Sequence, residues 1–147
     1  MRTTRQVAIY CAINENNRLF YILAKRSGDR GGFWQPFTGG EEDFDNGDLF
    51  STVIRELKEE IGLEIDKGSI LDINYGFTFT DKEGINRSET CFGVTIKPED
   101  KKDLKLSYEH SALIFCSEPE YLKSLMKFEE NKIGLEKFHQ ILIDNEK

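Results

Sequence analysis

The sequence has few cysteines and no pairing pattern among them. Its 147 residues include only Cys11, Cys91 and Cys116, and no two are spaced as Cys-x-x-Cys. An odd number without such a pair argues against a disulfide framework and against a thiolate zinc site. We therefore expect reduced, buried cysteines in a cytoplasmic protein.

Long apolar runs are also missing. No segment approaches the length needed to cross a bilayer, and residues 1–6 are polar and basic. We expect no signal peptide, no membrane partner and a cytoplasmic location. No repeat, low-complexity tract or linker divides the chain, so we expect a single domain over residues 1–147.

Positive charge is scarce. The chain has 20 Lys and Arg against 27 Asp and Glu, for a net charge of −7. An acidic surface does not attract a nucleic-acid backbone or an anionic membrane. The charge argues against a nucleic-acid partner, and it leaves open an enzyme that handles a small phosphate compound with the help of metal cations.

Hydrophobic spacing predicts an α/β fold. Early strands joined by a turn at residues 14–17 indicate a hairpin, and interspersed helices indicate a mixed sheet with helices on its faces. Asp48 is a candidate N-cap and Gly62 a candidate C-terminal stop for one helix. The expected strands are residues 7–13, 19–24, 70–80, 89–96 and 112–116, and the expected helices are residues 49–61, 119–130 and 135–145.

Three glutamates on the predicted helix 49–61 carry the main chemical signal. Glu56, Glu59 and Glu60 stand at i, i+3 and i+4, so their carboxylates share one face. Like charges at that spacing destabilise a helix by roughly 0.2–0.5 kcal/mol per pair. Such a cluster is either a solvated acidic face or a site for a hard cation such as Mg²⁺, which prefers oxygen ligands.

The surrounding residues resemble the Nudix box, Gly-x5-Glu-x7-Arg-Glu-U-x-Glu-Glu-x-Gly-U, where U is aliphatic. The second half matches at every position from Arg55 to Leu63. The first half departs, because Gly47 stands where the box has Glu and Glu41 where it has Gly. Asp48 or Asp45 is the candidate substitute for the missing glutamate.

The resemblance extends beyond the box, most closely to the bacterial dihydroneopterin triphosphate pyrophosphohydrolase branch of the Nudix family, also described as dATP pyrophosphohydrolase. The shared segments are 25–26, 33–35, 38–39, 86–90 and the Glu109-His110 pair. Phe115 stands near the place where that branch usually has a tryptophan. The resemblance implies a Nudix-type α/β/α sandwich with a mixed sheet and the Nudix helix.

The family resemblance also implies roles for individual residues. Arg55 matches the arginine that orients a catalytic glutamate, and Glu109 resembles the additional carboxylate that completes the metal site or acts as base. An exposed loop glutamate is the alternative for Glu109, and a structural role is favoured for its neighbour His110. The implied metal is Mg²⁺, with Mn²⁺ as the alternative. The implied ligands are Glu56, Glu59, Glu60 and Glu109 with a carbonyl of Gly39 or Gly40, and the implied catalytic residues are Arg55, Glu56, Glu59 and Glu109.

Four further residues are candidates for substrate binding. Lys25 and Arg26 stand at a strand end where they can contact phosphates, although a solvated surface pair is an equal alternative. Trp34 and Phe37 can stack on a flat base or pterin ring, or can simply belong to the core.

We therefore expect a metal-dependent pyrophosphohydrolase that acts on a nucleoside or pterin triphosphate, as a monomer or homodimer. Glu56 or Glu109 takes the proton of a metal-bound water in this reaction. The alternatives are a non-catalytic nucleotide sensor of the same fold and a hydrolase of another nucleoside diphosphate derivative or of RNA 5′ ends.

Overall fold

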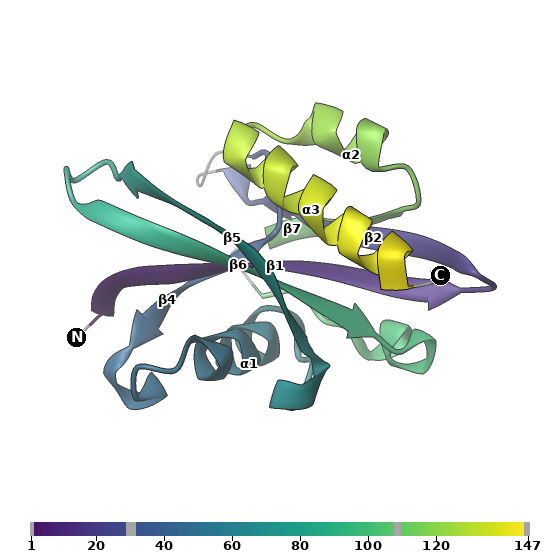
Figure 1. Cartoon of the computed structure of the whole chain (residues 1–147), viewed down its shortest axis with the longest axis horizontal. Coiled ribbons are helices and arrows are strands. Elements are labelled where there is room, and N and C mark those ends of the chain that lie inside the picture. The colour runs from purple at the N-terminus through teal and green to yellow at the C-terminus, as the bar shows by residue number, and fades with distance from the viewer. Residues whose placement is uncertain (1, 29–31, 108–109, 146–147) are drawn as a thin grey trace.

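The computed structural model describes residues 2–28, 32–107 and 110–145, and it has three layers (Figure 1). A mixed sheet lies in the middle, with helix α1 on one face and helices α2 and α3 on the other. This arrangement confirms the expected α/β sandwich. The helices are α1 (Leu49–Ile61), α2 (Pro119–Leu125) and α3 (Glu129–Asn145), and the strands are β1 (Arg2–Glu15), β2 (Arg18–Arg26), β3 (Trp34–Gln35), β4 (Phe37–Glu42), β5 (Ile70–Thr80), β6 (Asn86–Ile96) and β7 (His110–Cys116).

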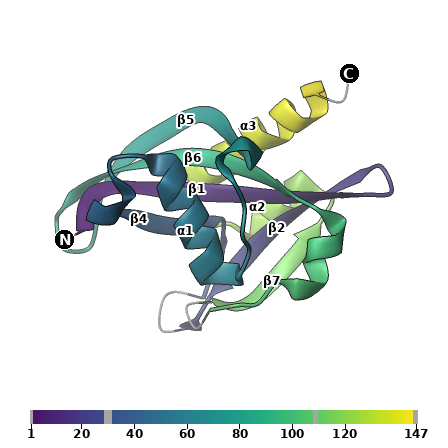
Figure 2. The ribbon, with the colours of Figure 1, turned by 90° about the horizontal axis from the view of Figure 1, so that it is seen from below.

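Strand β1 pairs with β2 along one part of its length and with β4 along another, and this pairing positions the glycine-rich strand β4. β1 pairs with β2 through residues 11–15 and with β4 through residues 2–9, while β6 runs parallel to it on the other side. β3 and β7 both pair with β2. Strand β4 therefore lies beside the centre of the sheet, directly over α1 (Figure 2).

Alternating residues of β1 supply two hydrophobic cores, as the period of two in a strand requires. Val7 and Ile9 belong to the core beneath α1, whereas Ala8 and Tyr10 belong to the core beneath α2 and α3. All four are buried. We refer below to the α1 face and the α3 face of the sheet. Within the described part of the chain, no helix is long and apolar enough to cross a membrane.

Helix α1 has the two ends that its sequence predicts. The Asp48 side chain accepts a hydrogen bond of 3.0 Å from the backbone N–H of Phe50, which satisfies one of the free donors of the first turn. Gly62 follows with a φ of 71° and donates its N–H to carbonyls of the last turn. Both caps therefore mark where the helix begins and ends.

An Asp48→Ala variant is expected to melt a few degrees lower, because it loses the cap of α1. The same carboxylate also pairs with exposed Lys67. The expected hydrolytic activity should stay within about twofold of the wild type, since an isolated cap acts on the helix alone. Thermal denaturation and a rate measurement check both statements. A large loss of activity at an unchanged melting temperature would instead place Asp48 in the active site.

The boundary between the last two helices is one prediction that was wrong. The sequence predicts a break at residues 131–134, but α3 runs through these residues and the break lies at residues 126–128. Gly134 is required inside the helix by packing, because a Cβ there would lie 2.3 Å from the Tyr10 hydroxyl oxygen. That hydroxyl donates to the backbone carbonyl of Asn131. Asn131 and Gly134 therefore make room for and bind Tyr10 of β1, and they do not end the helix.

Candidate active site

The Glu56 side chain lies beneath strand β4, next to Gly39. A Cβ at Gly39 would lie 2.0 Å from the Glu56 carboxyl carbon, so only glycine leaves room for this side chain. Glu56 is 4% exposed. The absence of a side chain at Gly39 therefore lets a buried carboxylate reach the backbone of β4.

Arg55 ties the parts of the site together. Its Nη1 donates to Oε1 of Glu56 at 2.9 Å, and its Nη2 donates to the carbonyl of Gly40 at 2.7 Å. Its Nε and Nη2 also donate to the two carboxylate oxygens of Asp45, at 3.2 and 3.0 Å. One planar guanidinium thus holds Glu56, the end of β4 and the following loop in fixed relative positions.

Asp45, and not Asp48, faces Arg55. Asp45 is 3% exposed and also accepts hydrogen bonds from the Thr52 hydroxyl and the Glu42 backbone. Burial alone would raise its pKa, but the hydrogen bond from Arg55, with the other two, holds the pKa of Asp45 below its usual value. The left-handed residues Asn46 and Gly47 turn the chain between Asp45 and the start of α1.

Glu60 is anchored one helical turn further on. The Ser107 hydroxyl donates to its Oε2 at 3.1 Å, and the Ser107 N–H donates to its carbonyl. Nδ1 of His110 lies 2.9 Å from the same Oε2, although the ring N–H is not aligned on it as a hydrogen bond. Glu60 and His110 are both buried. Sequence reasoning missed Ser107, which carries no motif, and favoured a structural role for His110, which contacts the site.

The donor set fits a hard cation, although it is not a complete cage. Glu56 and Glu60 are buried on one face of α1, while Glu59 is 56% exposed and lies 3.4 Å from Nη1 of Arg55. Glu109 lies outside the described residues. Among the residues that are described, no three His, Cys, Asp or Glu side chains converge closely enough to hold an ion. Oxygen-only ligands with open positions are what Mg²⁺ uses when it also binds phosphate.

The electrostatics of Glu56 agree with such a site. Burial raises the pKa of Glu56 to about 7; Arg55 opposes that rise, and the nearby carboxylates of Glu59 and Glu60 add to it. Without a cation, the carboxylate is held in an environment that disfavours its charge. A bound cation would remove that penalty, and a carboxyl group with a pKa near neutrality is suited to proton transfer.

A Gly39→Ala variant is expected to lose about a hundredfold in rate, because a shift of about 1 Å in a reacting group has an effect of this size. The new methyl group occupies the position of the Glu56 carboxyl and must displace it. The matched control is Gly28→Ala, since a Cβ at Gly28 has no atom within 4 Å. Steady-state rates of the two variants check the prediction, and equal rates would contradict it.

The four candidate substrate-binding residues divide between the two faces of the sheet. Phe37 is fully buried in the core beneath α1, so it offers no ring face to a ligand in this structure. Trp34 packs on the α3 face, and its backbone forms a parallel β-bridge with Met126. Lys25 pairs with Trp34 across the strands and so shares that face. Arg26 follows Lys25 along β2 and so points to the opposite face, the α1 face, where the glutamates lie.

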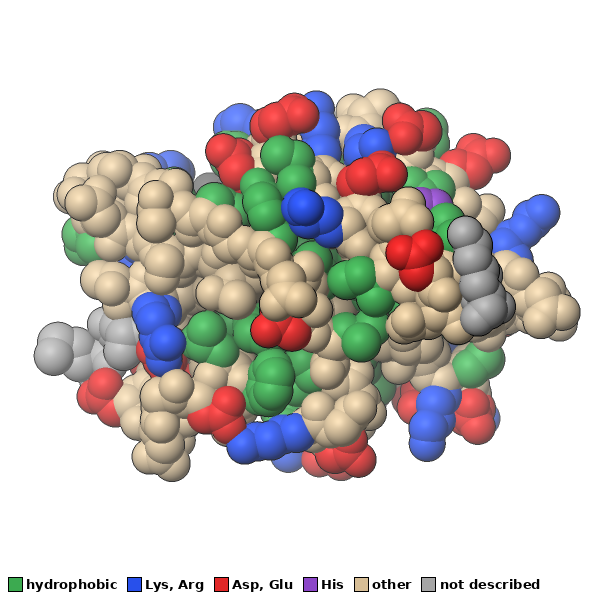
Figure 3. Space-filling view, in the orientation of Figure 1, with side chains coloured by type: hydrophobic (Ala, Val, Ile, Leu, Met, Phe, Trp, Pro, Cys, Tyr) green, Lys and Arg blue, Asp and Glu red, His purple; other side chains and the backbone are tan. Residues whose placement is uncertain are grey.

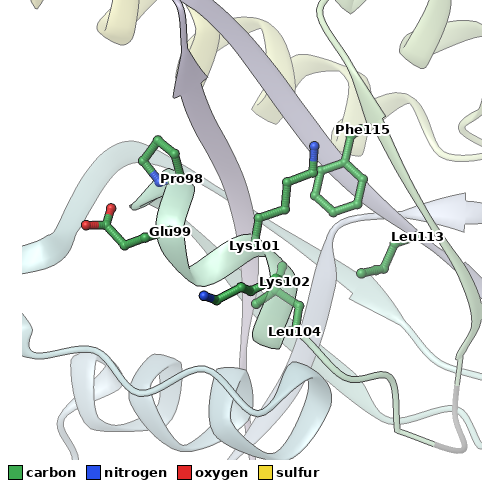
Figure 4. A pocket seen from close by; sticks show the side chains of 7 residues that line it. All are labelled: Pro98, Glu99, Lys101, Lys102, Leu104, Leu113 and Phe115. Carbon is green, nitrogen blue, oxygen red and sulfur yellow. The ribbon is translucent and has the colours of Figure 1, made fainter.

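A surface pocket lies further along the α1 face (Figure 4). It has a volume of about 520 Å³ and includes Leu104, Leu113 and Phe115, with Lys101 Nζ 4.7 Å from the Phe115 ring centroid. Of the glutamates, Glu99 lines it, but Glu56, Glu59 and Glu60 of α1 do not. The candidate active site is therefore the group of carboxylates beneath β4, and this pocket is not part of it.

Glu89 is a second buried carboxyl group, on the opposite face of the sheet. It is 4% exposed and accepts hydrogen bonds from the side chains of Gln6 and Asn131. Burial raises the pKa of Glu89 to about 6, against those two hydrogen bonds. The folded chain therefore holds this proton more tightly than the unfolded chain does.

A Glu89→Gln variant is expected to gain stability relative to the wild type as the pH rises. The raised pKa has no effect on stability below about pH 4.5, and above about pH 6 it destabilises the wild type by about 2 kcal/mol. Urea denaturation at about pH 4.5 and about pH 8 measures this pH-dependent part. A constant difference between variant and wild type at both pH values would contradict the assignment.

Comparison with known proteins gives one family and one fold. The family model described as the NUDIX domain matches residues 2–137. An Ap4A hydrolase from C. elegans in a binary complex has a TM-score of 0.79 at 21% identity, over 97% of this chain and 99% of that chain. The E. coli dihydroneopterin triphosphate pyrophosphohydrolase has a TM-score of 0.74 at 18% identity, over 93% and 95% of the two chains. At these identities, the structural likeness establishes the fold and not a substrate.

A curated relative is similar over part of its length. The octanoyltransferase of Myxococcus xanthus is 32% identical over 107 residues, which are 71% of this chain. The aligned stretch is 28% of that relative's own length. The likeness therefore concerns one segment of a much longer protein.

Proposed function

Because the chain belongs to the Nudix domain family, we propose that it is a metal-dependent pyrophosphohydrolase acting on a nucleoside triphosphate or a pterin triphosphate. Family membership supports the general activity, which is hydrolysis of a phosphoric anhydride bond. The observation that carries the finer proposal is the pair of buried glutamates on α1. Glu56 is held by Arg55 beneath Gly39, and Glu60 is held by Ser107.

The proposed reaction is a substitution at phosphorus. The oxygen of a water molecule forms a bond to the phosphorus next to the nucleoside or pterin, and the bond from that phosphorus to the bridging oxygen breaks. Pyrophosphate leaves with the electron pair, and the monophosphate remains. Glu56 or Glu109 accepts the proton of the water.

The residues of this chain have separate tasks in that reaction. Glu56, Glu59, Glu60 and Glu109 and a carbonyl of Gly39 or Gly40 would hold Mg²⁺ or Mn²⁺. When bound, such an ion neutralises the phosphate charge and lowers the pKa of a bound water. Arg55 keeps Glu56 aimed at the site.

Surface charge supports a small phosphate substrate over RNA. On the face shown in Figure 3, basic side chains stand apart from one another among acidic ones. The chain as a whole carries a net charge of −7. Nucleic-acid binders instead gather Lys and Arg along one stripe.

The experiment that tests the proposal measures pyrophosphate release from a panel of nucleoside and pterin triphosphates, with Mg²⁺ and with a chelator. Metal-dependent release from at least one member is the expected result, and an RNA with a 5′ triphosphate is included for comparison. Absence of release across the panel, by a folded protein that binds Mg²⁺, would contradict the proposal. It would favour a different diphosphate substrate or a non-catalytic sensor.

A further inference from the structure

A second arginine, Arg5 of β1, holds the end of β4 from outside helix α1. Its Nε donates to Oε1 of Glu41 at 2.8 Å, and its Nη2 donates to Oε2 at 2.5 Å. The Glu41 side chain is 4% exposed, whereas that of Arg5 is 44% exposed. A buried carboxylate is costly unless it is paired, so this bidentate contact stabilises a negative charge directly after Gly40.

The ion pair lies where the backbone pairing of β1 and β4 is interrupted. The register shifts between Arg2 and Gln6, so that residues 3–5 of β1 stand opposite Glu41 alone. A bulge of this kind disrupts the regular backbone hydrogen bonds between two strands. Figure 2 shows the end of β4 beside this N-terminal part of β1. At the bulge, the two strands are therefore joined by the side chains of Arg5 and Glu41.

Arg5 also joins the two ends of the loop that follows β4. Its Nη2 donates to the carbonyl of Gly47 at 3.0 Å. Asp45, which lies within the loop, accepts from Arg55, and Arg55 also donates to the carbonyl of Gly40. The loop is therefore held by two guanidinium groups, that of Arg55 from the helix and that of Arg5 from β1.

The contacts of Arg5 coincide with the departures from the Nudix box. Glu41 stands where the box has Gly, and Gly47 stands where the box has Glu. Arg5 binds the side chain of the first and the carbonyl of the second. The altered half of the box is thus fixed by a residue that lies far before it in the sequence.

We propose that Arg5 is a positioning residue of the metal site, which orients the Gly40 carbonyl through its contacts with Glu41 and Gly47. The inference rests on the proposed hydrolase function, because it assigns that carbonyl to the bound Mg²⁺ or Mn²⁺. Groups that orient a metal ligand without touching the metal change metal affinity or activity by about 10–100-fold when they are replaced. Arg5 belongs to none of the recognised motifs, yet it contributes to metal binding.

The test is the binding of Mn²⁺ to the protein without substrate, measured by calorimetry. Arg5→Met should raise the Kd for Mn²⁺ about tenfold. Arg5→Lys should raise it less, because lysine keeps the charge but cannot bind both oxygens of Glu41 in the fork geometry of arginine. The matched control is Arg87→Met, which breaks an arginine–carboxylate pair with Asp81 in the β5–β6 hairpin and should bind Mn²⁺ as the wild type does.

A second substitution separates positioning from stability. In Arg5→Met the Glu41 carboxylate is buried without its arginine, so the melting temperature should fall. Adding Glu41→Gln removes that charge and should recover part of the melting temperature. The Kd for Mn²⁺ should stay high in the double variant, because the loop still lacks the contacts that Arg5 makes. If Mn²⁺ affinity recovered together with the melting temperature, the proposal would be overturned, since Arg5 would then be structural alone.

An unchanged or lower Kd in Arg5→Met would also overturn the proposal. A lower value would mean that Glu41, once released from Arg5, becomes a metal ligand itself. A wild-type protein that binds no Mn²⁺ would overturn it as well, because no metal site would then be there to position.

These outcomes are separate from a failure of the proposed function. Binding of Mn²⁺ is measured without turnover, so it reports on Arg5 whether or not the panel of triphosphates is cleaved. With a cleaved substrate, Arg5→Met should raise the Mg²⁺ concentration that gives half the maximal rate, and excess Mg²⁺ should restore much of the rate. A loss of rate that excess Mg²⁺ leaves unchanged would contradict a role in positioning the metal ligand.

Discussion

A Glu60→Gln variant is expected to release pyrophosphate about a thousandfold more slowly than the wild type while keeping its fold. Glutamine has the shape of glutamate and can still accept the hydrogen bond from the Ser107 hydroxyl. It lacks the negative charge, and so it removes one of the two buried carboxylates that would hold the metal. Rates at saturating Mg²⁺ and thermal denaturation of both proteins measure the two halves of this prediction.

The control for Glu60→Gln is Glu64→Gln. Glu64 lies three residues after the end of α1, is 76% exposed and forms an ion pair with exposed Lys58. Its replacement removes one negative charge near the helix without touching the buried pair. Normal turnover by Glu60→Gln at saturating Mg²⁺ would remove Glu60 from the site, whereas equal losses in both variants would indicate a general effect of charge.

The sequence predicts α1 well because its signals are local. The apolar spacing, the Asp48 cap and the Gly62 stop all lie within the helix or beside it, and each acts on backbone groups a few residues away. The apolar spacing also determines which face the glutamates occupy, because Val53, Leu57 and Ile61 pack into the core. The core of the candidate site could therefore be predicted from a single segment.

The parts that could not be predicted depend on contacts between distant segments. Gly134 signals a break in a helix, yet in the fold it accommodates Tyr10 of β1. Asp45 and Asp48 are equivalent as sequence, and only the left-handed turn after Asp45 brings that carboxylate to Arg55. Gln35 lies in one of the segments shared with the family, but the sequence does not show that its amide nitrogen is buried without a partner, which is a property of the folded surroundings.

Phe37 and Trp34 show the same limit for aromatic residues. Their sequence positions make either one a candidate for stacking on a ring. Sheet register decides between the two, since it sends Phe37 into the core beneath α1 and Trp34 to the α3 face. Periodicity predicts that two such residues alternate, but it does not say which face a substrate approaches.

An Arg55→Met variant is expected to be the least stable of the single variants, with a loss of about 3–5 kcal/mol in the free energy of unfolding. The side chain of Arg55 is 17% exposed, and its partners Asp45 and Glu56 are 3% and 5% exposed. Methionine fills much of the volume but leaves both carboxylates buried without a cation. It also leaves the Gly40 carbonyl without its donor.

Urea denaturation measures the loss, and a second substitution identifies its cause. Asp45→Asn in the Arg55→Met background should recover part of the stability, because it removes one of the two unpaired charges. Arg87→Met is the control, since Arg87 pairs with Asp81 near a turn where both side chains are partly exposed. That change should cost about 1 kcal/mol or less.

The pH dependence of the stability of Arg55→Met shows whether Arg55 acts through the charges of its carboxylate partners. In the wild type, Arg55 and the other hydrogen bonds keep the pKa of Asp45 below its usual value, so the stability from this pair is present at neutral pH and is lost as the pH falls through that depressed pKa. In the variant the same buried carboxyl has no cation, and protonation relieves it. The gap between variant and wild type should therefore be widest at about pH 7 and should narrow towards about pH 4. A gap that is constant with pH would show that Arg55 acts through packing alone and not through the carboxylates it holds.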